Sequence, residues 1–533
     1  MKQRWGLIVL VAIVSFLSGG WLLRGARNRT DVSGPELLQT VMQYIDRFYV
    51  DSVGPDSLYD MAAAGAVKEL NDPYSVLEDQ EDYKALSEVT TGNYGGLGMQ
   101  IDVRNGVITI VAPLPGTPAE RAGIQAGDQI EQVDGHPTDN ITQDKAIKLL
   151  RGAPGTRVDV RIRRPGTTEL LPFSLVREVI HNRSVQPGTM LDGTIGYVAL
   201  STVSDSSASE LRSEISGLLK QGMKGLILDL RENPGGLLTQ GASVSDLFLD
   251  PGRKIVETRG RMPDMNHRFV DQMPQPWPAL PIVVLVNEYT ASAAEIIAGA
   301  LQDNDRAVIV GNATFGKGLV QTLWPFGNGR GLKLTTGRWY TPSGRTIQRT
   351  ASSQADQVKL ANDEATRAGS RWLDSLPSFK TVSGRIVKGG GGIVPDRLVR
   401  TDTLTDGEKD FAKGIGSNVA AFRDALVAVA LDVKAKHSVS SPDFQVTDPM
   451  RQAVLDRLRA KKVTLTPQQV AAGTKLVDQQ LAYEVDAYVF GRAAQLRRRT
   501  EDDPQVRAAL RLFQNGATQA ALLSQVSGGP SIQ

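Results

Sequence analysis

Apolar runs alternate with helix-like stretches from residue 195 onward, and this alternation limits the possible fold more than any other feature. The runs at 225–230 and 282–286 are almost entirely apolar, and the stretch at 207–221 carries leucine and isoleucine at helical spacing. Strands that are apolar on both faces belong inside a sheet that helices cover on both sides. The pattern therefore predicts an α/β core.

Other patterns flank this core. Residues 35–90 and 403–515 carry apolar residues at helical spacing, so both regions are expected to be mostly helical. Between 84 and 180, short β-like runs and one helix-like stretch follow a glycine-rich loop at 95–99, which indicates a compact module. The last eight residues, 526–533, are expected to be frayed.

The N-terminus carries one long apolar segment. Lys2 and Arg4 precede an uninterrupted run over 6–23, which ends at Arg24. A run of about 18 residues is just long enough to span a bilayer. We expect residues 1–29 to be a transmembrane anchor or signal segment, with an uncleaved anchor preferred. The body of the protein is then expected outside the cytoplasm, periplasmic or extracytoplasmic, although the basic residues after the run outnumber those before it, against the usual bias.

The composition excludes several kinds of chemistry. The chain has no cysteine, so disulfides, zinc ribbons, iron–sulfur clusters and cysteine nucleophiles are impossible. Its four histidines are scattered, which argues against a histidine metal site: His136, His181, His267 and His437. We expect no metal and no cofactor. The net charge of +2 gives no bulk attraction to nucleic acid, so none is expected as a partner.

The segment 311–318 resembles a phosphate-binding loop but fails the physical requirements for one. Gly316 and Lys317 fit the G-x-x-x-x-G-K pattern after an apolar run. Gly318 stands where a hydroxyl should reach magnesium, and the run at 319–323 is typical of a strand. A phosphate loop must instead open a helix, whose N-terminus meets the phosphates.

Ser292 is a candidate nucleophile in the same region. It follows a buried strand and begins an Ala-rich helix, a turn that can expose a hydroxyl beside backbone N–H groups. The alternative is purely structural, since Ser292-Ala-Ala-Glu295 is also a complete helix capping box. The residues alone leave both interpretations open.

Lys317 is the candidate base that would activate this serine, because no histidine lies within 20 residues of it. Lysine is a poor base at its ordinary pKa of about 10.4, and burial beside apolar groups lowers that pKa. Gln321, four residues on, shares the face of Lys317 if the segment is a strand and could hold the amine. The alternative is an ordinary solvated turn lysine.

Seven motifs occur in one order along the chain, and together they resemble a known family. They are Asn71-Asp-Pro-Tyr-Ser75, Gly-Gly-Leu-Gly-Met at 95–99, Asp229-Leu-Arg-Glu-Asn-Pro-Gly-Gly236, Thr290-Ala-Ser-Ala-Ala-Glu-Ile296, Thr314-Phe-Gly-Lys-Gly-Leu-Val-Gln321, Gly337-Arg-Trp-Tyr-Thr-Pro-Ser-Gly-Arg345 and Gly392-Ile-Val-Pro-Asp396. Over about residues 35–400 the sequence resembles the carboxy-terminal processing peptidases, or tail-specific proteases. These are serine peptidases with a Ser–Lys dyad and a PDZ module.

The resemblance implies an α/β protease core of crotonase-like ββα units with an inserted PDZ module, an N-terminal helical region and a mostly helical C-terminal extension. The domains it implies are 1–29 anchor or signal segment, 30–83 N-terminal helical region, 84–180 PDZ domain, 181–400 peptidase core with an insertion at about 351–380, and 401–533 helical extension.

The resemblance also implies roles for individual residues. Ser292 resembles the nucleophile, Lys317 the general base and Gln321 the residue that orients the lysine. The oxyanion hole is implied at the N–H of Ala293 with that of Gly236 or Gly235. Peptide binding is implied at Gly96, Leu97, Gly98 and Met99, and at Arg164 (or its neighbour Arg163) as an arginine that touches the active-site region when a peptide binds.

The implied function is serine endopeptidase activity that cleaves proteins near or from their C-terminal tails, with the PDZ domain recognising the tail and gating activity. The alternative is a catalytically inactive PDZ scaffold. Expected partners are proteins with accessible C-terminal tails, an adaptor or regulator, the membrane through the N-terminal segment, and further copies of the chain through the N- or C-terminal helices.

Overall fold

The computed structural model describes residues 33–104, 107–139, 141–164, 167–349, 369–400 and 404–532. The expected anchor at 1–29 and most of the insertion at 351–380 lie outside the described residues. The chain divides into two compact units, one made of residues up to 78 with 323–334, and one made of 79–322 with 335 to the end. Each unit is described by itself.

The smaller unit is built from two helices and the end of a β-hairpin. Helix α2 (Gly34–Phe48) and helix α3 (Pro55–Lys68) precede strand β1 (Val76–Glu78), which pairs antiparallel with the start of β18 (Gly331–Tyr340). Several large apolar side chains on the two helices are exposed, among them Tyr44, Phe48, Tyr59 and Met61.

The larger unit contains a seven-stranded sheet, which is the α/β core that the alternating pattern predicts. Its order is β10 (Thr189–Leu191), β11 (Ile195–Ala199), β12 (Gly225–Asp229), β15 (Ile282–Val286), β16 (Val308–Gly311), β21 (Arg397–Leu398) and β22 (Ser531–Ile532). All neighbours from β11 to β22 are parallel, and β10 is antiparallel to β11.

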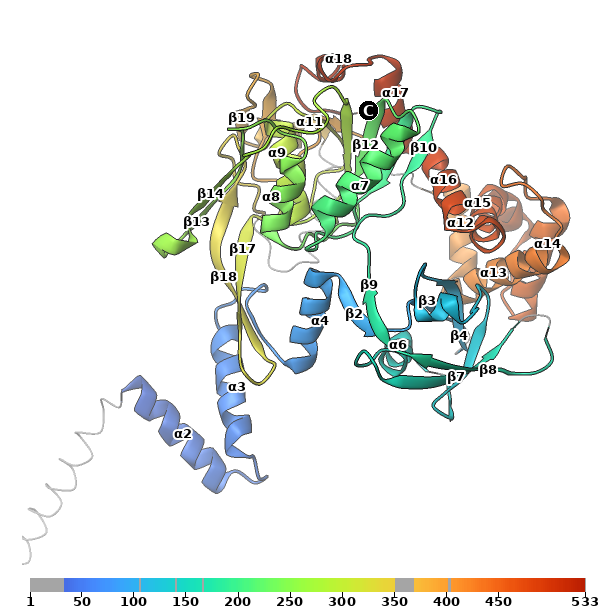
Figure 1. Cartoon of the computed structure of the whole chain (residues 1–533), viewed down its shortest axis with the longest axis horizontal. Coiled ribbons are helices and arrows are strands. Elements are labelled where there is room, and N and C mark those ends of the chain that lie inside the picture. The colour runs from blue at the N-terminus through green and yellow to red at the C-terminus, as the bar shows by residue number, and fades with distance from the viewer. Residues whose placement is uncertain are drawn as a thin grey trace, which may run out of the picture. The chain divides into compact units, whose positions relative to one another are not determined.

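Helices cover both faces of this sheet, which is why its central strands are apolar throughout (Figure 1). Leu226 and Leu228 pack with helices α7 (Ser207–Lys220), α8 (Leu238–Asp246) and α9 (Ala293–Asp303), whereas Ile227 packs with α17 (Pro504–Gln514) and α18 (Gln519–Ser524). Alternate side chains of one strand thus enter two separate cores.

The C-terminal residues complete the sheet. The expectation that 526–533 fray is wrong, because Val526 is buried and β22 pairs with β21. Composition misled here, since a short edge strand carries little signal of its own. The extension is therefore part of the core, and Arg231 next to β12 forms an ion pair with Asp503 at 2.6 Å.

A second sheet packs through β13 (Lys254–Gly260) against helices α8 and α9 and carries a long hairpin. It contains β13, β14 (His267–Val270), β17 (Leu319–Pro325) and β18, and a short pair follows it, β19 (Ser378–Lys380) with β20 (Ile386–Lys388). The one-turn 3₁₀ helix η1 (Pro263–Met265) joins β13 to β14, and α11 (Gly369–Ser375) precedes β19. β17 starts two residues after Lys317, so this sheet places the lysine segment.

The module between 93 and 181, called here the β-module, is a separate six-stranded sheet with two helices. Its strands are β3 (Met99–Arg104), β4 (Val107–Pro113), β5 (Gln129–Val133), β6 (His136–Pro137), β7 (Arg157–Arg163) and β8 (Leu171–Val176), and its helices are α5 (Pro118–Arg121) and α6 (Gln143–Leu150). Strand β2 (Asn93–Gly96) pairs with β9 (Glu178–His181), so the chain enters and leaves the module through one ladder. Helix α4 (Gln80–Thr91) leads into β2.

The remaining extension is a helical bundle with its own apolar core. It comprises α12 (Asp406–Ile415), α13 (Val419–Lys436), α14 (Asp448–Ala460), α15 (Pro467–Val485), the π-helix η2 (Asp486–Phe490) and α16 (Arg492–Asp502). The bundle contacts the β-module, where Lys434 Nζ donates to Ala126 O at 3.2 Å and Arg423 pairs with Asp102 at 3.3 Å (Figure 1).

A helix that spans a membrane must be both long and apolar. Within the described ranges, no single helix is long and apolar enough to cross a bilayer. α12 and α13 together reach the length and composition, but they are bent by 98° at the break between them.

The Asp271 carboxyl gives the fold a pH-dependent element. Its side chain is buried, and burial raises the pKa of Asp271 to about 7, with further rises from hydrogen bonding to Asp246 and from the charges of Asp246 and Asp250. The folded state therefore keeps this proton at pH values where the unfolded chain has lost it. This contribution to stability is present at low pH and is lost as the pH rises through about 7.

Asp271→Asn should therefore flatten the dependence of unfolding free energy on pH. Relative to the parent protein, the variant should gain stability between pH 5 and pH 8, because an amide carries no charge to bury. Chemical denaturation at a series of pH values measures this, with the exposed Asp264→Asn as control. An unchanged pH profile in Asp271→Asn would contradict the assignment.

Candidate active site

Three loops meet at one edge of the seven-stranded sheet. Strands β12, β15 and β16 are parallel neighbours, with Asp229 opposite Leu285 and Val286 opposite Gly311. Their carboxyl ends therefore lie together, at the edge of a parallel sheet where sites commonly form. The loop after β12 holds the two glycines 235 and 236, the loop after β15 leads to Ser292, and the loop after β16 leads to Lys317.

Ser292 occupies a strained backbone conformation at the start of α9. Its φ is +55° and its ψ is −118°, in a region that residues with a side chain rarely adopt. Such strain persists only where surrounding contacts hold it, and it is typical of functional turns. Ser292 is partly exposed, although all eleven residues of α9 that follow it are buried.

The capping box that Ser292-Ala-Ala-Glu295 predicts is present, but its two reciprocal contacts are not equally well formed. The Ser292 side chain faces the N–H of Glu295, yet it makes no capping hydrogen bond. The reverse contact is well formed, because the Ser292 N–H donates to Glu295 Oε2 at 2.8 Å. The carboxylate, not the hydroxyl, therefore holds this turn.

Glu295 also holds the lysine segment. Its Oε2 accepts the N–H of Lys317 at 2.9 Å, and its Oε1 accepts the N–H of Gly316 at 2.8 Å and the hydroxyl of Thr314 at 2.5 Å. The side chain is completely buried. Burial raises the pKa of Glu295, and the four hydrogen bonds oppose that rise. One oxygen thus joins the backbones of Ser292 and Lys317.

Lys317 lies in a tight turn that its neighbours fix. Gly316 has a φ of +86°, and a Cβ there would lie 2.6 Å from the Arg349 side chain, so no larger residue fits. Trp339 Nε1 donates to Lys317 O at 3.0 Å. A strand follows the turn, as expected, so the segment lacks the helix that a phosphate loop requires.

Gln321 is placed on β17, beside β18 of the same sheet. Its amide donates to Thr335 Oγ1 at 3.4 Å, a long hydrogen bond that keeps the side chain on the sheet surface. Gln321 is partly buried.

The two glycines lie against the serine turn. A Cβ on Gly235 would lie 2.8 Å from Ala293 N, and a Cβ on Gly236 would lie 2.0 Å from Val203 O, so both positions exclude a side chain. The N–H of Gly235 donates to Asn233 Oδ1 at 2.9 Å. Asn233 O in turn accepts the N–H of Ala291 at 2.9 Å and so ties the glycine loop to the serine turn.

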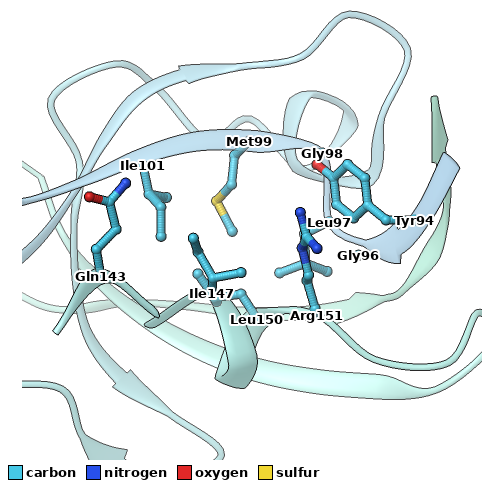
Figure 2. Close-up of a pocket in the computed structure, with 10 residues that line it drawn as sticks. All are labelled: Tyr94, Gly96, Leu97, Gly98, Met99, Ile101, Gln143, Ile147, Leu150 and Arg151. Carbon is cyan, nitrogen blue, oxygen red and sulfur yellow. The ribbon is translucent and has the colours of Figure 1, made fainter. Parts of the chain in front are cut away.

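The β-module carries a groove of about 160 Å³ between β3 and α6 (Figure 2). It is lined by Tyr94, Gly96, Leu97, Gly98, Met99, Ile101, Gln143, Ile147, Leu150 and Arg151. All four loop residues expected to bind peptide are among them. Gly98 has a φ of +72°, and a Cβ there would lie 2.2 Å from Thr117, so the loop requires glycine at this position.

Arg164 lies within the β-module. Its guanidinium binds Asp128 through two hydrogen bonds of 2.8 Å, and it also donates to Gly123 O at 2.9 Å. Arg163, the other candidate, pairs with Glu131. Arg164 is partly buried by these contacts, so reaching another part of the chain requires it to leave Asp128.

Glu295 is the residue whose role sequence reasoning missed, since its position predicted only a helix cap. A signal was available, because Glu295 is the one acidic residue in the otherwise apolar stretch 293–301 of the helix. An unpaired buried carboxylate is costly, so a glutamate in such a helix indicates a set of hydrogen-bond donors around it.

Two models of known protein families match this chain. A family model for peptidase family S41 matches residues 194–356, and a PDZ domain model matches residues 109–164. An α/β peptidase domain joined to a PDZ domain is the class of protein that these matches define.

Individual relatives extend the match. The chain is 36% identical over 343 residues to the carboxy-terminal processing protease CtpA of Bacillus subtilis, covering 64% of this chain and 73% of that one. It is 40% identical over 304 residues to a carboxy-terminal-processing protease of Bartonella bacilliformis, and the match covers 56% of this chain and 69% of that one. The solved structure of a photosystem II D1 C-terminal processing protease is 30% identical to this chain, with a TM-score of 0.35. The match covers 60% of this chain and 91% of that one.

The chain belongs to the carboxy-terminal processing proteases, PDZ-containing serine peptidases of family S41. The assignment rests on the sequence matches, which favour an active serine endopeptidase over an inactive PDZ scaffold.

Glu295→Gln should impair both activity and stability. Each carboxylate oxygen accepts a backbone N–H, so either orientation of the amide sets its NH₂ group against a donor. We expect kcat/KM to fall about 100-fold and the free energy of unfolding to fall by about 2 kcal/mol. Peptidase kinetics and chemical denaturation measure the two effects.

Glu288→Gln is the matched control. Glu288 is also buried near the serine turn, but its carboxylate accepts a hydrogen bond from the Asn312 side chain at 3.1 Å and none from the backbone of Ser292 or Lys317. Near-parental kcat/KM in Glu295→Gln would show that the carboxylate does not position the two segments.

Proposed function

We propose that Ser292 is the nucleophile and Lys317 the general base of this peptidase. The observation that carries the proposal is the Glu295 carboxylate, whose Oε2 accepts the backbone N–H of both residues. Two segments 25 positions apart in the sequence are thereby held against one atom. Ser292 has a strained backbone and is partly exposed, whereas its neighbours on both sides are buried, and this supports the same assignment.

In the proposed reaction, neutral Lys317 takes the hydroxyl proton as the Ser292 oxygen attacks a peptide carbonyl. The protonated lysine then gives this proton to the leaving amine, which leaves an acyl-enzyme. Water, deprotonated by Lys317, hydrolyses the ester and regenerates the serine. Gln321, on the strand that follows Lys317, is proposed to orient the amine.

The oxyanion is proposed to bind the N–H of Ala293 together with that of Gly236. The contact distances that exclude a Cβ from Gly235 support this location, because they set the glycine loop against Ala293 N. Gly236 is preferred over Gly235, whose N–H already donates to Asn233. Removing one such donor typically costs about 3 kcal/mol of transition-state stabilisation.

The PDZ groove is proposed to capture the C-terminal tail of a substrate protein. A chain end would add as a strand beside β3, with its carboxylate at the loop of Gly96, Leu97, Gly98 and Met99. The apolar lining supports tails that end in an apolar residue. Arg164 remains a proposed link to the active-site region, and it would have to exchange Asp128 for a new partner there.

The finer architecture is also a proposal. We propose crotonase-like ββα units in the core and domain limits at 1–29, 30–83, 84–180, 181–400 and 401–533. The limit at 400/401 divides the sequence but not the structure, because α17 and α18 pack on the core sheet and β22 is one of its strands. The exposed apolar side chains of α2 and α3 support a homo-oligomer through the N-terminal helices.

Ser292→Ala and Lys317→Ala should each lower kcat/KM at least about 1,000-fold while leaving the fold intact, because each removes a group that forms or breaks a bond. The assay is cleavage of a loosely folded protein with a free C-terminal tail. Ser209→Ala and Lys220→Ala, both exposed on α7, are the matched controls. Full activity in either Ser292→Ala or Lys317→Ala would refute the mechanism. In the parent protein, kcat/KM should rise with pH as the lysine loses its proton, and a cleavage rate that does not rise with pH would also refute it.

We also propose that residues 1–29 anchor the protein in a membrane with the body outside the cytoplasm. The apolar run over 6–23 supports this. Deleting 1–29 should move the protein from the membrane fraction to the soluble fraction and leave peptidase activity unchanged. A full-length protein found only in the soluble fraction with Met1 still present would contradict the anchor.

A further inference from the structure

The glycine loop of the proposed oxyanion hole is anchored at its start by an arginine whose partners come from two distant parts of the chain. Arg231 lies two residues after β12, and its Nε and Nη2 atoms donate to the carboxylate of Asp229, at 2.9 Å and 2.6 Å. Its Nη1 atom donates to Asp503 Oδ2 at 2.6 Å and to Gln505 Oε1 at 2.9 Å. The C-terminal extension therefore supplies both acceptors of Nη1.

The two extension residues are themselves held in place. Asp503 is the N-cap of α17, and its Oδ1 accepts the N–H groups of Gln505 and Val506 at 2.8 Å and 3.2 Å. Gln505 is completely buried, and its amide donates to Val399 O at 2.8 Å. Helix α17 packs on the core sheet through apolar side chains (Figure 1). The acceptors of Nη1 therefore have fixed positions.

The other side of the same network reaches into the loop backbone. The Asp229 carboxylate accepts the backbone N–H of Arg231 at 2.9 Å in addition to the guanidinium, and the buried hydroxyl of Tyr197 donates to it at 2.6 Å. Burial, followed by the charge of Asp229, raises the pKa of Tyr197, so this hydroxyl keeps its proton and donates. Arg231 thus determines the course of the chain as it leaves β12, and Gly236 follows five residues later.

Stability alone explains this polar cluster poorly. The side chains of Arg231 and Asp503 are only 15% and 21% exposed, and an ion pair this far out of water adds little net stability because both charges lose hydration. The apolar side chains of α17, among them Val506 and Leu512, already hold the helix on the sheet. The cluster adds a direction, because a planar guanidinium donates in its own plane and two fixed acceptors set its orientation.

We propose that Asp503 is a positioning residue of the active site, which together with Gln505 holds Arg231 and thereby sets the glycine loop so that the N–H of Gly236 meets the oxyanion. The C-terminal extension then acts on the reaction through this loop, without contacting the reacting atoms itself. The inference rests on the proposed roles of Ser292 and the oxyanion hole.

Two substitutions isolate the contact between Asp503 and Arg231. Asparagine caps a helix as well as aspartate does, so Asp503→Asn keeps the hydrogen bonds to the start of α17. Its NH₂ group then faces Arg231 Nη1, which sets a donor against a donor. Asp503→Ser also keeps a capping oxygen, but its shorter, uncharged side chain loses the ion pair.

The probes are a short peptide that ends in alaninal, an aldehyde, and the same peptide that ends in alaninol, an alcohol. The Ser292 oxygen forms a bond with the aldehyde carbon, its proton passes to Lys317, and the aldehyde oxygen becomes the oxyanion. The alcohol has no carbonyl and binds without reacting. Inhibition of cleavage by the full-length protein gives a Ki for each probe. The ratio of the two values does not depend on how much of a variant is folded, because both report the folded fraction.

The parent protein should bind the aldehyde at least about 100-fold more tightly than the alcohol, as expected for a transition-state analogue. Asp503→Asn and Asp503→Ser should each lower this preference about ten-fold, a part of the roughly 100-fold that loss of a whole oxyanion donor costs. The Ki of the alcohol should stay at the parental value. A role in stability alone would leave the preference unchanged.

Asp478→Asn is the matched control. Asp478 pairs with Arg451 inside the helical bundle at 2.7 Å, and the two side chains are 29% and 20% exposed, close to the values for the Asp503 pair. Removing this ion pair should leave the preference for the aldehyde at the parental value.

The outcomes separate the two proposals. If the parent protein binds both probes equally, the proposed nucleophile and oxyanion hole fail, and the inference fails with them. If the parent prefers the aldehyde and both Asp503 variants keep that preference, the positioning role of Asp503 alone is overturned. An equal loss of preference in Asp478→Asn also overturns it, because the effect would then follow from removing any ion pair of the extension.

Discussion

One buried carboxylate joins the parts of the candidate active site. Glu295 has no basic partner among the contacts described above; backbone N–H groups from two loops and one hydroxyl surround it. Because an unsatisfied buried carboxylate is costly, the two loops cannot separate without losing several charge-assisted hydrogen bonds. The strained backbone of Ser292 and the tight turn at Lys317 both depend on this restraint.

The sheet beneath these loops depends on residues from distant parts of the chain. The parallel order of β12, β15 and β16 brings the three loops to one edge, and helices from the C-terminal extension cover the face opposite α7, α8 and α9. The same extension contacts the PDZ domain through Lys434 and Arg423. The sheets of the peptidase core, the PDZ domain and the extension therefore belong to one compact unit.

Much of this could be predicted from the sequence because it is encoded locally. Continuous apolar runs mark the core strands, the glycines at 98 and 316 stand where the backbone excludes a side chain, and the ordered motifs indicate the family. The pairing of residues 531–532 with β21 could not be predicted, because strand partners far apart in sequence leave no local signal. The same reason hid the second role of Glu295, which depends on contacts between distant segments.

The most direct test of the central claim is to locate the acyl group during turnover. A peptide ester substrate is mixed with the protein, the reaction is quenched in acid within milliseconds, and the acylated residue is mapped by mass spectrometry. The account predicts one acyl group on Ser292 in a rapid burst, and a much smaller burst in Glu295→Gln with the acyl group at the same residue. An acyl group on another residue, or an undiminished burst in Glu295→Gln, would contradict it.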